Sequence, residues 1–415
     1  MKVYFTLFSI LISSLGFAQS WIETSQLPSS SRYDDIHFNS DENGWAINAS
    51  GEIYKTTDGG KIWRNVREGT GYLRSIEFIN DSIGFVGSLG RTFLRTTDAG
   101  ETWIDIRDSL PMSPGICGLS HAGDHVFGVG RWSTPAYFIK SVDKGISWTQ
   151  MDMSEFGDGL VDCYFIDQLK GFVTGMDYKD GPFILRTLDG GENWTKVFST
   201  PGLMSYVWKI FFVNPDVAYA SIESSEGKFQ VAKTVDGGEN WSLVKAPGGD
   251  YDIQGIGFIT PLHGWVSPRY NALFETIDGG ESWESIGQIS NVNRFFQVPN
   301  GRLYASGSQV IYYDDVSSAE NPQKNIYNHS LSVFPNPFEF EFTVEALIDV
   351  ETEVVLGIGS VEASEFIPIY KGRLGKGLHT FAITKAHIEK FPSQGLLVVL
   401  GTDEGFLSEK VIKVK

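Results

Sequence analysis

Short apolar segments separated by polar turns recur along most of this chain. Residues 36–38 and 44–46 are two such segments, and the turn between them contains Asn, Ser and Asp. Two apolar segments joined by a polar turn predict a β-hairpin. A third segment at residues 53–54 and a fourth that begins at Trp63 complete the unit. Four short strands in each repeat of about 40–47 residues predict one blade of a β-propeller.

A motif of the form S/T-x-D-x-G-x-x-W marks the repeat and occurs six times, with its aspartates 40, 45, 46, 47 and 42 residues apart. We expect the aspartate to accept hydrogen bonds from backbone N–H groups of its own turn. The glycine can supply the positive φ of a hairpin turn, and the tryptophan can bury its ring as the next strand begins. We therefore assign structural roles to six pairs: Asp58 and Trp63, Asp98 and Trp103, Asp143 and Trp148, Asp189 and Trp194, Asp236 and Trp241, and Asp278 and Trp283.

A seventh unit lacks the motif and has only three apolar segments, at residues 294–296, 301–305 and 309–313. The missing fourth strand is available at residues 21–24, where Trp21 takes the place of the motif tryptophan. Pairing the two ends of the repeat region in one blade would close the ring and remove its exposed edges. We therefore predict seven blades within residues 19–315, with six blades and a loose tail as the alternative.

The chain changes character after the repeats. Residues 316–330 are polar and predict a linker. Residues 331–415 contain alternating apolar and polar strands without the motif, which predicts a small Ig-like β-sandwich. The expected fold class is thus all-β, a seven-bladed β-propeller followed by a small β-sandwich.

Composition and the N-terminus limit the location and the partners. Residues 1–18 combine Lys2, a short apolar run and small residues before Gln19, which predicts a secretory signal peptide. No later segment is apolar enough to predict a membrane span. The formal net charge of −18 argues against a nucleic-acid partner. Cys117 and Cys163 either form a disulfide or are buried as small apolar side chains.

The repeated motif resembles the Asp-box of sialidase-like propellers and of propellers like the photosystem II assembly factors. The second resemblance implies a single seven-bladed exported propeller that binds protein partners and does not catalyse a reaction. The sialidase resemblance implies three arginines on a carboxylate and an Arg-Ile-Pro motif at the first inner strand. That motif is absent here, because residues 31–35 read Ser-Arg-Tyr-Asp-Asp.

The C-terminal region resembles the sorting domain of the type IX secretion system. Residues 331–338 read Leu-Ser-Val-Phe-Pro-Asn-Pro-Phe, and the chain ends in a basic-apolar strand at residues 409–415. Leu396 and Leu397 replace the small residue and the aromatic residue typical of that family. The resemblance implies that residues 331–415 contact the type IX machinery and that the protein is secreted or reaches the outer-membrane surface.

Candidate binding residues lie near the starts of the inner strands. Arg32, Arg74 and Arg294 either converge on an anionic ligand or pair with nearby carboxylates. Asp34, Asp35 and Asp162 would be the acids of a sialidase-like or glucanase-like glycoside hydrolase, which is the alternative to a ring that binds a protein or a glycan. We expect no cofactor and no metal, and we place His121 and His125 around a solvated turn. The predicted channel rim is Arg32, Asp34, Arg74, Asp162, Trp208, Lys209, Gln254 and Arg294.

Overall fold

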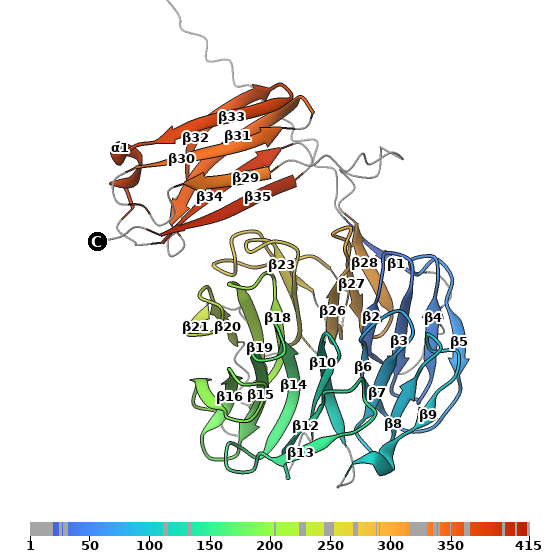
Figure 1. Cartoon of the computed structure of the whole chain (residues 1–415). Coiled ribbons are helices and arrows are strands. Elements are labelled where there is room, and N and C mark those ends of the chain that lie inside the picture. The colour runs from blue at the N-terminus through green and yellow to red at the C-terminus, as the bar shows by residue number, and fades with distance from the viewer. Residues whose placement is uncertain are drawn as a thin grey trace, which may run out of the picture. The chain divides into compact units, whose positions relative to one another are not determined.

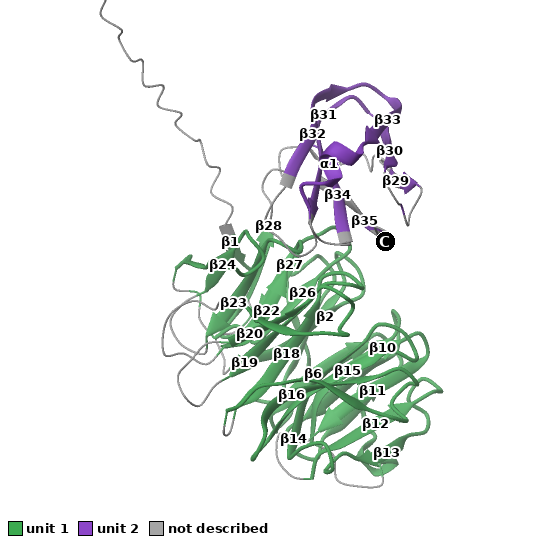
Figure 2. Ribbon diagram, turned by 90° about the vertical axis from the view of Figure 1, so that its left-hand side faces the viewer, with its two compact units in different colours: residues 1–315 green, residues 316–415 purple. Residues whose placement is uncertain are grey.

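The computed structural model divides the chain into two compact units, residues 1–315 and residues 316–415 (Figure 2). The predicted signal peptide and nearly all of the predicted linker lie outside the residues that the structure describes. The described residues are 20–24, 27, 32–110, 115–130, 135–202, 205–223, 230–244, 253–268, 273–287, 289, 291–314, 330–334, 338, 341–348, 350–360, 366–391, 395–402 and 405–412.

The first unit contains seven four-stranded antiparallel sheets (Figure 1). Six of them consist of four strands consecutive in the chain. From its first to its fourth strand, the first blade is β2(Tyr33–Phe38), β3(Gly44–Asn48), β4(Ile53–Thr56) and β5(Arg64–Arg67), and the second is β6(Leu73–Phe78), β7(Gly84–Ser88), β8(Phe93–Thr96) and β9(Ile104–Asp105), followed by the 3₁₀ helix η1(Arg107–Ser109). The third blade is β10(Ile116–Ala122), β11(His125–Gly130), β12(Tyr137–Ser141) and β13(Thr149–Asp152), and the fourth is β14(Gly159–Phe165), β15(Gly171–Asp177), β16(Gly181–Thr187) and β17(Thr195–Ser199). The fifth blade is β18(Tyr206–Phe212), β19(Ala218–Glu223), β20(Gln230–Thr234) and β21(Ser242–Val244), and the sixth is β22(Ile253–Phe258), β23(Gly264–Pro268), β24(Phe274–Thr276) and β25(Glu284–Ser285).

The seventh blade joins both ends of the propeller, in the order β26(Arg294–Gln297), β27(Leu303–Ser306), β28(Val310–Asp314) and β1(Ser20–Glu23). Trp21 pairs with Tyr313 across β1 and β28. The first strand of each blade contacts the first strand of the next, and β26 contacts β2, so the seven first strands form a closed ring. The prediction of seven blades is confirmed, and the six-bladed alternative is wrong.

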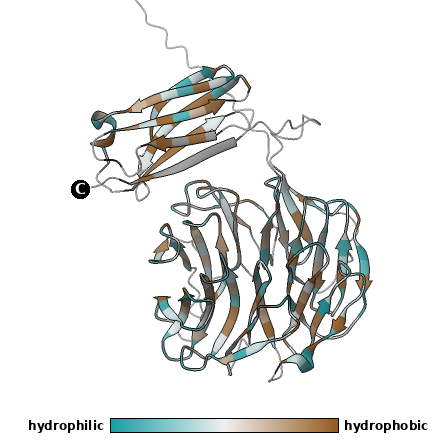
Figure 3. Cartoon of the chain, viewed as in Figure 1, coloured by the Kyte–Doolittle hydropathy of each residue, from teal (hydrophilic) through white to brown (hydrophobic). Residues whose placement is uncertain are grey.

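Aromatic rings pack between neighbouring blades. A ring on the second strand of one blade stacks on the ring that ends the first strand of the next blade. The centroids of Trp45 and Phe78 are 3.7 Å apart, and those of Phe127 and Phe165 are 3.5 Å apart. Hydrophobic residues are frequent along the propeller strands (Figure 3), and successive residues such as Phe85 and Val86 belong to different apolar clusters on opposite faces of their blade. Each blade therefore presents an apolar face to both of its neighbours.

Each Asp-box forms a hydrogen-bonded turn between the third and fourth strands. In the fourth blade, Asp189 Oδ1 accepts hydrogen bonds from the Thr187 hydroxyl at 2.8 Å and the Asn193 amide at 2.9 Å. The Asn193 side chain also donates to Asp189, and these bonds lower the pKa of Asp189 to about 2. The motif glycine has a positive φ in all six copies, at values from 75° to 94°. An L side chain is strained in that conformation, which explains the glycine.

A second repeated feature links the blades. The residue before the Ser or Thr of the motif is basic in five of the six copies. Lys55 Nζ lies 2.8 Å from Glu101 of the next blade, and Lys140 Nζ lies 3.5 Å from Glu192 of the next blade. Lys233 donates at 3.1 Å to a backbone carbonyl in the Asp-box of the sixth blade. These inter-blade cations therefore connect the Asp-boxes of the second, fourth and sixth blades to the blade before them.

The second unit is a β-sandwich of two antiparallel sheets, as predicted. Side chains of both sheets, such as Val344, Leu356 and Val398, share one buried core. One short helix, α1(Lys385–Ile388), follows the third strand of the smaller sheet. The smaller sheet consists of β29(Ser330–Phe334), β30(Phe342–Ile348) and β33(Gly377–Ile383), and the larger of β32(Phe366–Leu374), β31(Thr352–Ser360), β34(Gly395–Thr402) and β35(Gly405–Ile412).

Candidate functional site

A β-bulge interrupts the inner strand of six blades at the same place. In β2, Tyr33 pairs with Asn48 and Asp35 pairs with Ile47, so the residue between them has no partner on β3. A bulge of this kind turns an extra side chain toward one face of the sheet. Here five of the six bulge side chains, each from a different blade, line one pocket and so point into the central channel of the ring. The residues at these bulges are Asp34, Arg74, Cys117, Val161, Trp208 and Gln254.

At this end of the channel, two arginines share one buried carboxylate. Asp34 Oδ1 accepts hydrogen bonds from Arg32 Nε at 2.8 Å, from Arg74 Nη1 at 2.6 Å and from the Tyr72 hydroxyl at 3.2 Å. Burial would lower the pKa of Arg74, but the Asp34 charge and smaller contributions from other nearby groups together outweigh that effect and raise it. Of the two alternatives for these arginines, pairing with a carboxylate describes the observed geometry.

Trp208 completes this group. The guanidinium carbon of Arg74 lies 5.1 Å from the centre of the Trp208 ring, and Trp208 Nε1 donates to Asn293 at 3.3 Å. Arg32 donates to Gln254 at 2.7 Å. We call this end of the channel the Arg mouth. It contains a pocket of about 220 Å³ whose lining includes Arg32, Tyr72, Arg74, Trp208, Glu223 and Gln254.

The middle of the channel is filled by buried ion pairs. Arg294 lies between two carboxylates, 3.2 Å from Asp35 and 3.1 Å from Asp162. Lys209 Nζ lies 3.8 Å from Asp162. Asp34, Asp162 and Lys209 are at most 2% exposed. The sequence predicted these three residues on the rim. They lie inside the channel instead, because the bulges and the ion pairs hold them there.

The burial of Lys209 predicts a pH dependence of stability. Burial lowers the pKa of Lys209 to about 8 despite the attraction of Asp162, whereas an unfolded lysine titrates near pH 10.4. Between these values the unfolded chain holds a proton that the folded chain has lost, so stability rises with pH. We expect a gain of about 2 kcal/mol from pH 8 to pH 10. Guanidinium unfolding at pH 8, 9 and 10 measures it.

Lys209→Met supplies the control for that measurement. The methionine fills a similar volume but has no proton to lose, so we expect its stability to change little between pH 8 and pH 10. A wild-type curve that is flat or falls over this range would contradict the prediction. A rise that Lys209→Met retains would assign the effect to another group.

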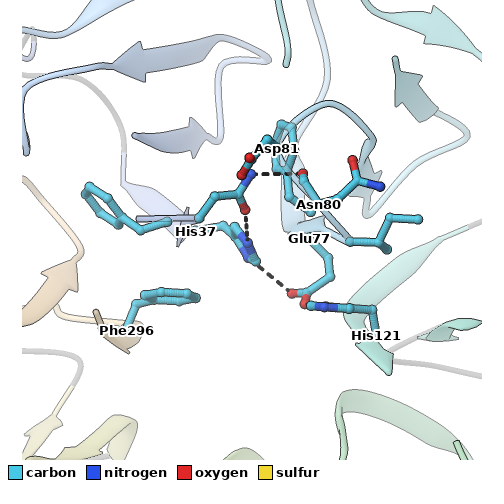
Figure 4. Close-up of a pocket in the computed structure, with 10 residues that line it drawn as sticks. His37, Glu77, Asn80, Asp81, His121 and Phe296 are labelled. Atoms are coloured by element: carbon cyan, nitrogen blue, oxygen red, sulfur yellow. Dashed lines mark hydrogen bonds and ion pairs between the residues drawn. The ribbon is translucent and has the colours of Figure 1, made fainter. Parts of the chain in front are cut away.

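The opposite end of the channel has different chemistry. Asp34 lies near the start of β2 and His37 near its end, about 10 Å further along the strand. Here His121 Nδ1 lies 2.6 Å from Glu77 Oε1, and His37 Nδ1 lies 3.4 Å from Glu77 Oε2 (Figure 4). Burial would raise the pKa of Glu77, but the two imidazoles outweigh it and lower it to about 2. We call this end the His mouth.

The His mouth contains a pocket of about 350 Å³, and Phe296 of β26 lies across it from Glu77 and His121 (Figure 4). The expectation that His121 is a solvated turn residue is wrong, because β10 extends through His121 and aims the imidazole at Glu77 of the neighbouring blade. Among the described residues, no group of three or more His, Cys, Asp or Glu side chains is arranged to hold a metal ion. Cys117 and Cys163 are both buried and do not form a disulfide with each other.

Comparisons with known proteins agree with this fold. Residues 16–119 match the family of the photosynthesis system II assembly factor YCF48. The match covers roughly a quarter of the chain. No curated protein matches the chain by sequence. In the described part of the chain, no helix has the length and apolar character needed to cross a membrane.

Several solved propellers are similar in structure. YCF48 bound to a D1 peptide has a TM-score of 0.54 at 19% identity, over 71% of this chain and 94% of that chain. The GH74 xyloglucanase from Xanthomonas campestris has a TM-score of 0.54 at 10% identity, over 95% and 74%. PorZ, a surface component of the type IX secretion system of Porphyromonas gingivalis, has a TM-score of 0.51 at 10% identity, over 94% and 60%. At these identities the likeness shows the propeller fold alone.

The structure brings all eight predicted channel residues together, around one end and the middle of the channel. It also adds residues that the sequence reasoning did not select. Asn293 bridges Arg32 and Trp208, and Tyr72 bonds to Asp34. Glu77 and Phe296 did lie in recognised inner-strand segments. Glu77 and Phe296 occupy places in their blades that correspond to His37, and this correspondence could have identified them from the sequence.

Proposed function

We propose that this chain is an exported propeller that binds a protein partner through the Arg mouth. The observation that carries the proposal is the fixed group of Arg32, Tyr72, Arg74 and Trp208 around a pocket. Arg, Tyr and Trp are the residue types that contribute most to binding energy at protein interfaces. Their hydrogen bonds and stacking already hold them in place, so little side-chain entropy is lost when a partner binds.

The size of the pocket favours a protein segment over a whole small molecule. Its volume of about 220 Å³ is below the range of roughly 300–1,000 Å³ that small-molecule sites occupy. A side chain of a partner fits such a pocket, while the surrounding rim contacts the rest of the segment. YCF48, a propeller of similar fold, has been solved with a D1 peptide bound, which supports a peptide as the ligand.

The geometry disfavours hydrolysis by the three candidate acids. A glycoside hydrolase needs two carboxyl groups that reach the glycosidic bond. Asp34, Asp35 and Asp162 are each at most 3% exposed and lie in ion pairs. A sugar could contact them only if those pairs broke. The GH74 xyloglucanase shares the fold, but a shared fold does not imply a shared reaction.

Export is the second part of the proposal. We infer that residues 1–18 direct passage across the inner membrane and that residues 331–415 direct type IX secretion. The sequence of residues 331–338 and the sandwich fold of the second unit support this inference. Deleting residues 331–415 in a host that has the type IX system should leave the protein in the periplasm. Surface exposure of the truncated protein would contradict the sorting role.

Binding by the full-length chain tests the Arg mouth. A random peptide library and a glycan array provide the probes, and the affinity of any selected ligand is then measured for variants. We expect Trp208→Ala and Arg32→Gln to weaken a peptide ligand about tenfold or more, since Trp and Arg at such positions are typical hot spots. The matched control is Arg64→Gln, because Arg64 lies on the outer strand β5, is 58% exposed and pairs with Glu101.

Four outcomes decide between the candidates. A selected peptide that loses affinity with Trp208→Ala and not with Arg64→Gln supports protein binding. A glycan with the same pattern of losses would make the Arg mouth a carbohydrate site. No saturable ligand, or one unaffected by the Arg-mouth variants, would overturn the proposal. Turnover of glycoside substrates by the wild-type protein would make it a hydrolase.

A further inference from the structure

We propose that the His mouth is a second and separate binding site, and that its ligand is a neutral sugar ring. The inference does not depend on the proposed function of the Arg mouth, because the two pockets share no residue. It rests on the size of the pocket, on a wall of fixed polar groups, on an aromatic wall opposite, and on the balance of charge between them.

The pocket has the dimensions of a small-molecule site. Its volume of about 350 Å³ lies within the range of roughly 300–1,000 Å³ typical of such sites. The turns after β2 and β6 contribute Asn39, Asn80 and Asp81 to its lining, and the inner strands contribute the remaining side chains used below (Figure 4). A single pyranose ring is therefore a ligand of suitable size.

Hydrogen bonds hold the polar wall in place. His121 bonds to Glu77, and the other ring nitrogen of His37, Nε2, lies 3.0 Å from Asn39 Oδ1. Asn39 in turn donates to the Asn80 backbone carbonyl at 2.9 Å. Imidazole, carboxylate and amide groups together offer both donors and acceptors. Sugar hydroxyls also donate and accept, so this set of groups matches them.

Phe296 supplies the aromatic wall. Its ring is half-buried and lies 5.0 Å from the His37 ring and 6.2 Å from the Phe38 ring, centroid to centroid. These contacts fix the orientation of Phe296. Binding pockets commonly combine such an apolar surface with a few fixed polar groups. The apolar face of a pyranose can pack on the ring while its hydroxyls turn toward Glu77 and His121.

The charges of the pocket favour a neutral ligand. Glu77 has a pKa of about 2, and its hydrogen bond and charge raise the pKa of His121 despite burial, so each group favours the charged form of the other. Because these charges already compensate each other, an ionic ligand would lose its hydration without gaining an unpaired opposite charge. Asp81 lies at the exposed rim, where solvent and salt screen its charge. Neutral hydroxyl groups do not have to give up the hydration of a charge when they enter the pocket.

Calorimetric titration of the full-length protein tests the site. The probes are the methyl glycosides of glucose, galactose, mannose and N-acetylglucosamine and their short oligomers, at 50 mM and 500 mM NaCl. We expect saturable binding with a Kd that changes less than twofold between the two salt concentrations. Phe296→Ala and His121→Ala should each weaken it at least tenfold. His263→Ala is the matched control, since His263 forms a similar pair with Glu275 outside the pocket.

The outcomes separate the inference from its alternatives. Saturable binding lost in both pocket variants and kept in His263→Ala supports it. No binding to any probe, or binding that the pocket variants leave unchanged, overturns it. Affinity that falls steeply with salt, or a preference for charged sugars, overturns the neutral ligand. If Phe296→Ala fails to fold, Phe296→Leu keeps the volume and removes only the ring. Peptide binding at the Arg mouth, measured on the same samples, succeeds or fails independently.

Discussion

Replacing Asp162 by Ala should destabilise the propeller by about 3–5 kcal/mol, the largest loss we expect from any single channel residue. Asp162 is 1% exposed and accepts from Arg294 and from the Ile210 backbone N–H at 3.2 Å. It also lies near Lys209. Without it, two cations remain buried and keep only Asp35 as a close counter-charge. Removing one partner of a buried pair costs much more than the pair itself contributes.

Two further variants identify the cause of this loss. Asp162→Asn keeps a hydrogen-bond acceptor and removes the charge, so it should fall between wild type and Asp162→Ala. The double variant Asp162→Ala with Lys209→Met removes one of the stranded cations and should recover part of the lost stability. Urea unfolding measures all four proteins. A loss below about 1 kcal/mol for Asp162→Ala would contradict the prediction, as would a double variant no more stable than the single one.

Trp21→Ala should open the ring at its only seam and lower the free energy of unfolding by about 3 kcal/mol. The Trp21 ring lies 5.3 Å from Trp265 and 5.9 Å from Phe295, edge to face, and 5.6 Å from Tyr313. It therefore holds β1 against two blades at once. Its loss leaves a cavity under a strand of only four residues.

Hydrogen exchange shows whether the loss is local to the seam. In Trp21→Ala we expect the amides of β28 to exchange faster, because β1 covers the edge of that strand. Glu23→Ala is the control in the same strand, since Glu23 is exposed and, among the described residues, its side chain bonds only to Gln309, at 3.0 Å. That variant should change stability by less than about 0.5 kcal/mol. Equal effects of the two variants would show that Trp21 has no special role.

The fold was predictable from the sequence because the repeated motif indicates where the turns and strands of each blade lie. Each Asp-box marks one turn of known type, and the spacing of the boxes gives the number of strands between them. The fourth strand of the last blade was predictable because the seventh unit lacks a motif tryptophan and Trp21 can take its place. The strand β32 was not predicted, since its residues, such as Tyr370 and Lys371, follow no clear two-residue alternation.

The candidate site was less predictable than the fold. The sequence placed Arg32, Arg74 and Arg294 near one another, but not the β-bulges that turn Asp34 and Arg74 into the channel. A bulge adds a single residue, which a repeat that varies by several residues does not reveal. His121 was misplaced for a related reason, because the third blade departs from the pattern that marks the end of the other inner strands. Contacts between blades determine both the direction of the bulge side chains and the position of His121. These contacts form only when the ring is closed.

The inter-blade cations have a consequence for how the propeller unfolds. Lys55 and Lys140 each attach to the Asp-box of the following blade, so melting one blade removes a contact from the next. In an open array of repeats, such nearest-neighbour coupling still lets the end repeats fray first. A ring has no end repeat. Its first opening event must break two interfaces at once, so the seven blades should be lost in one cooperative transition and not in sequence.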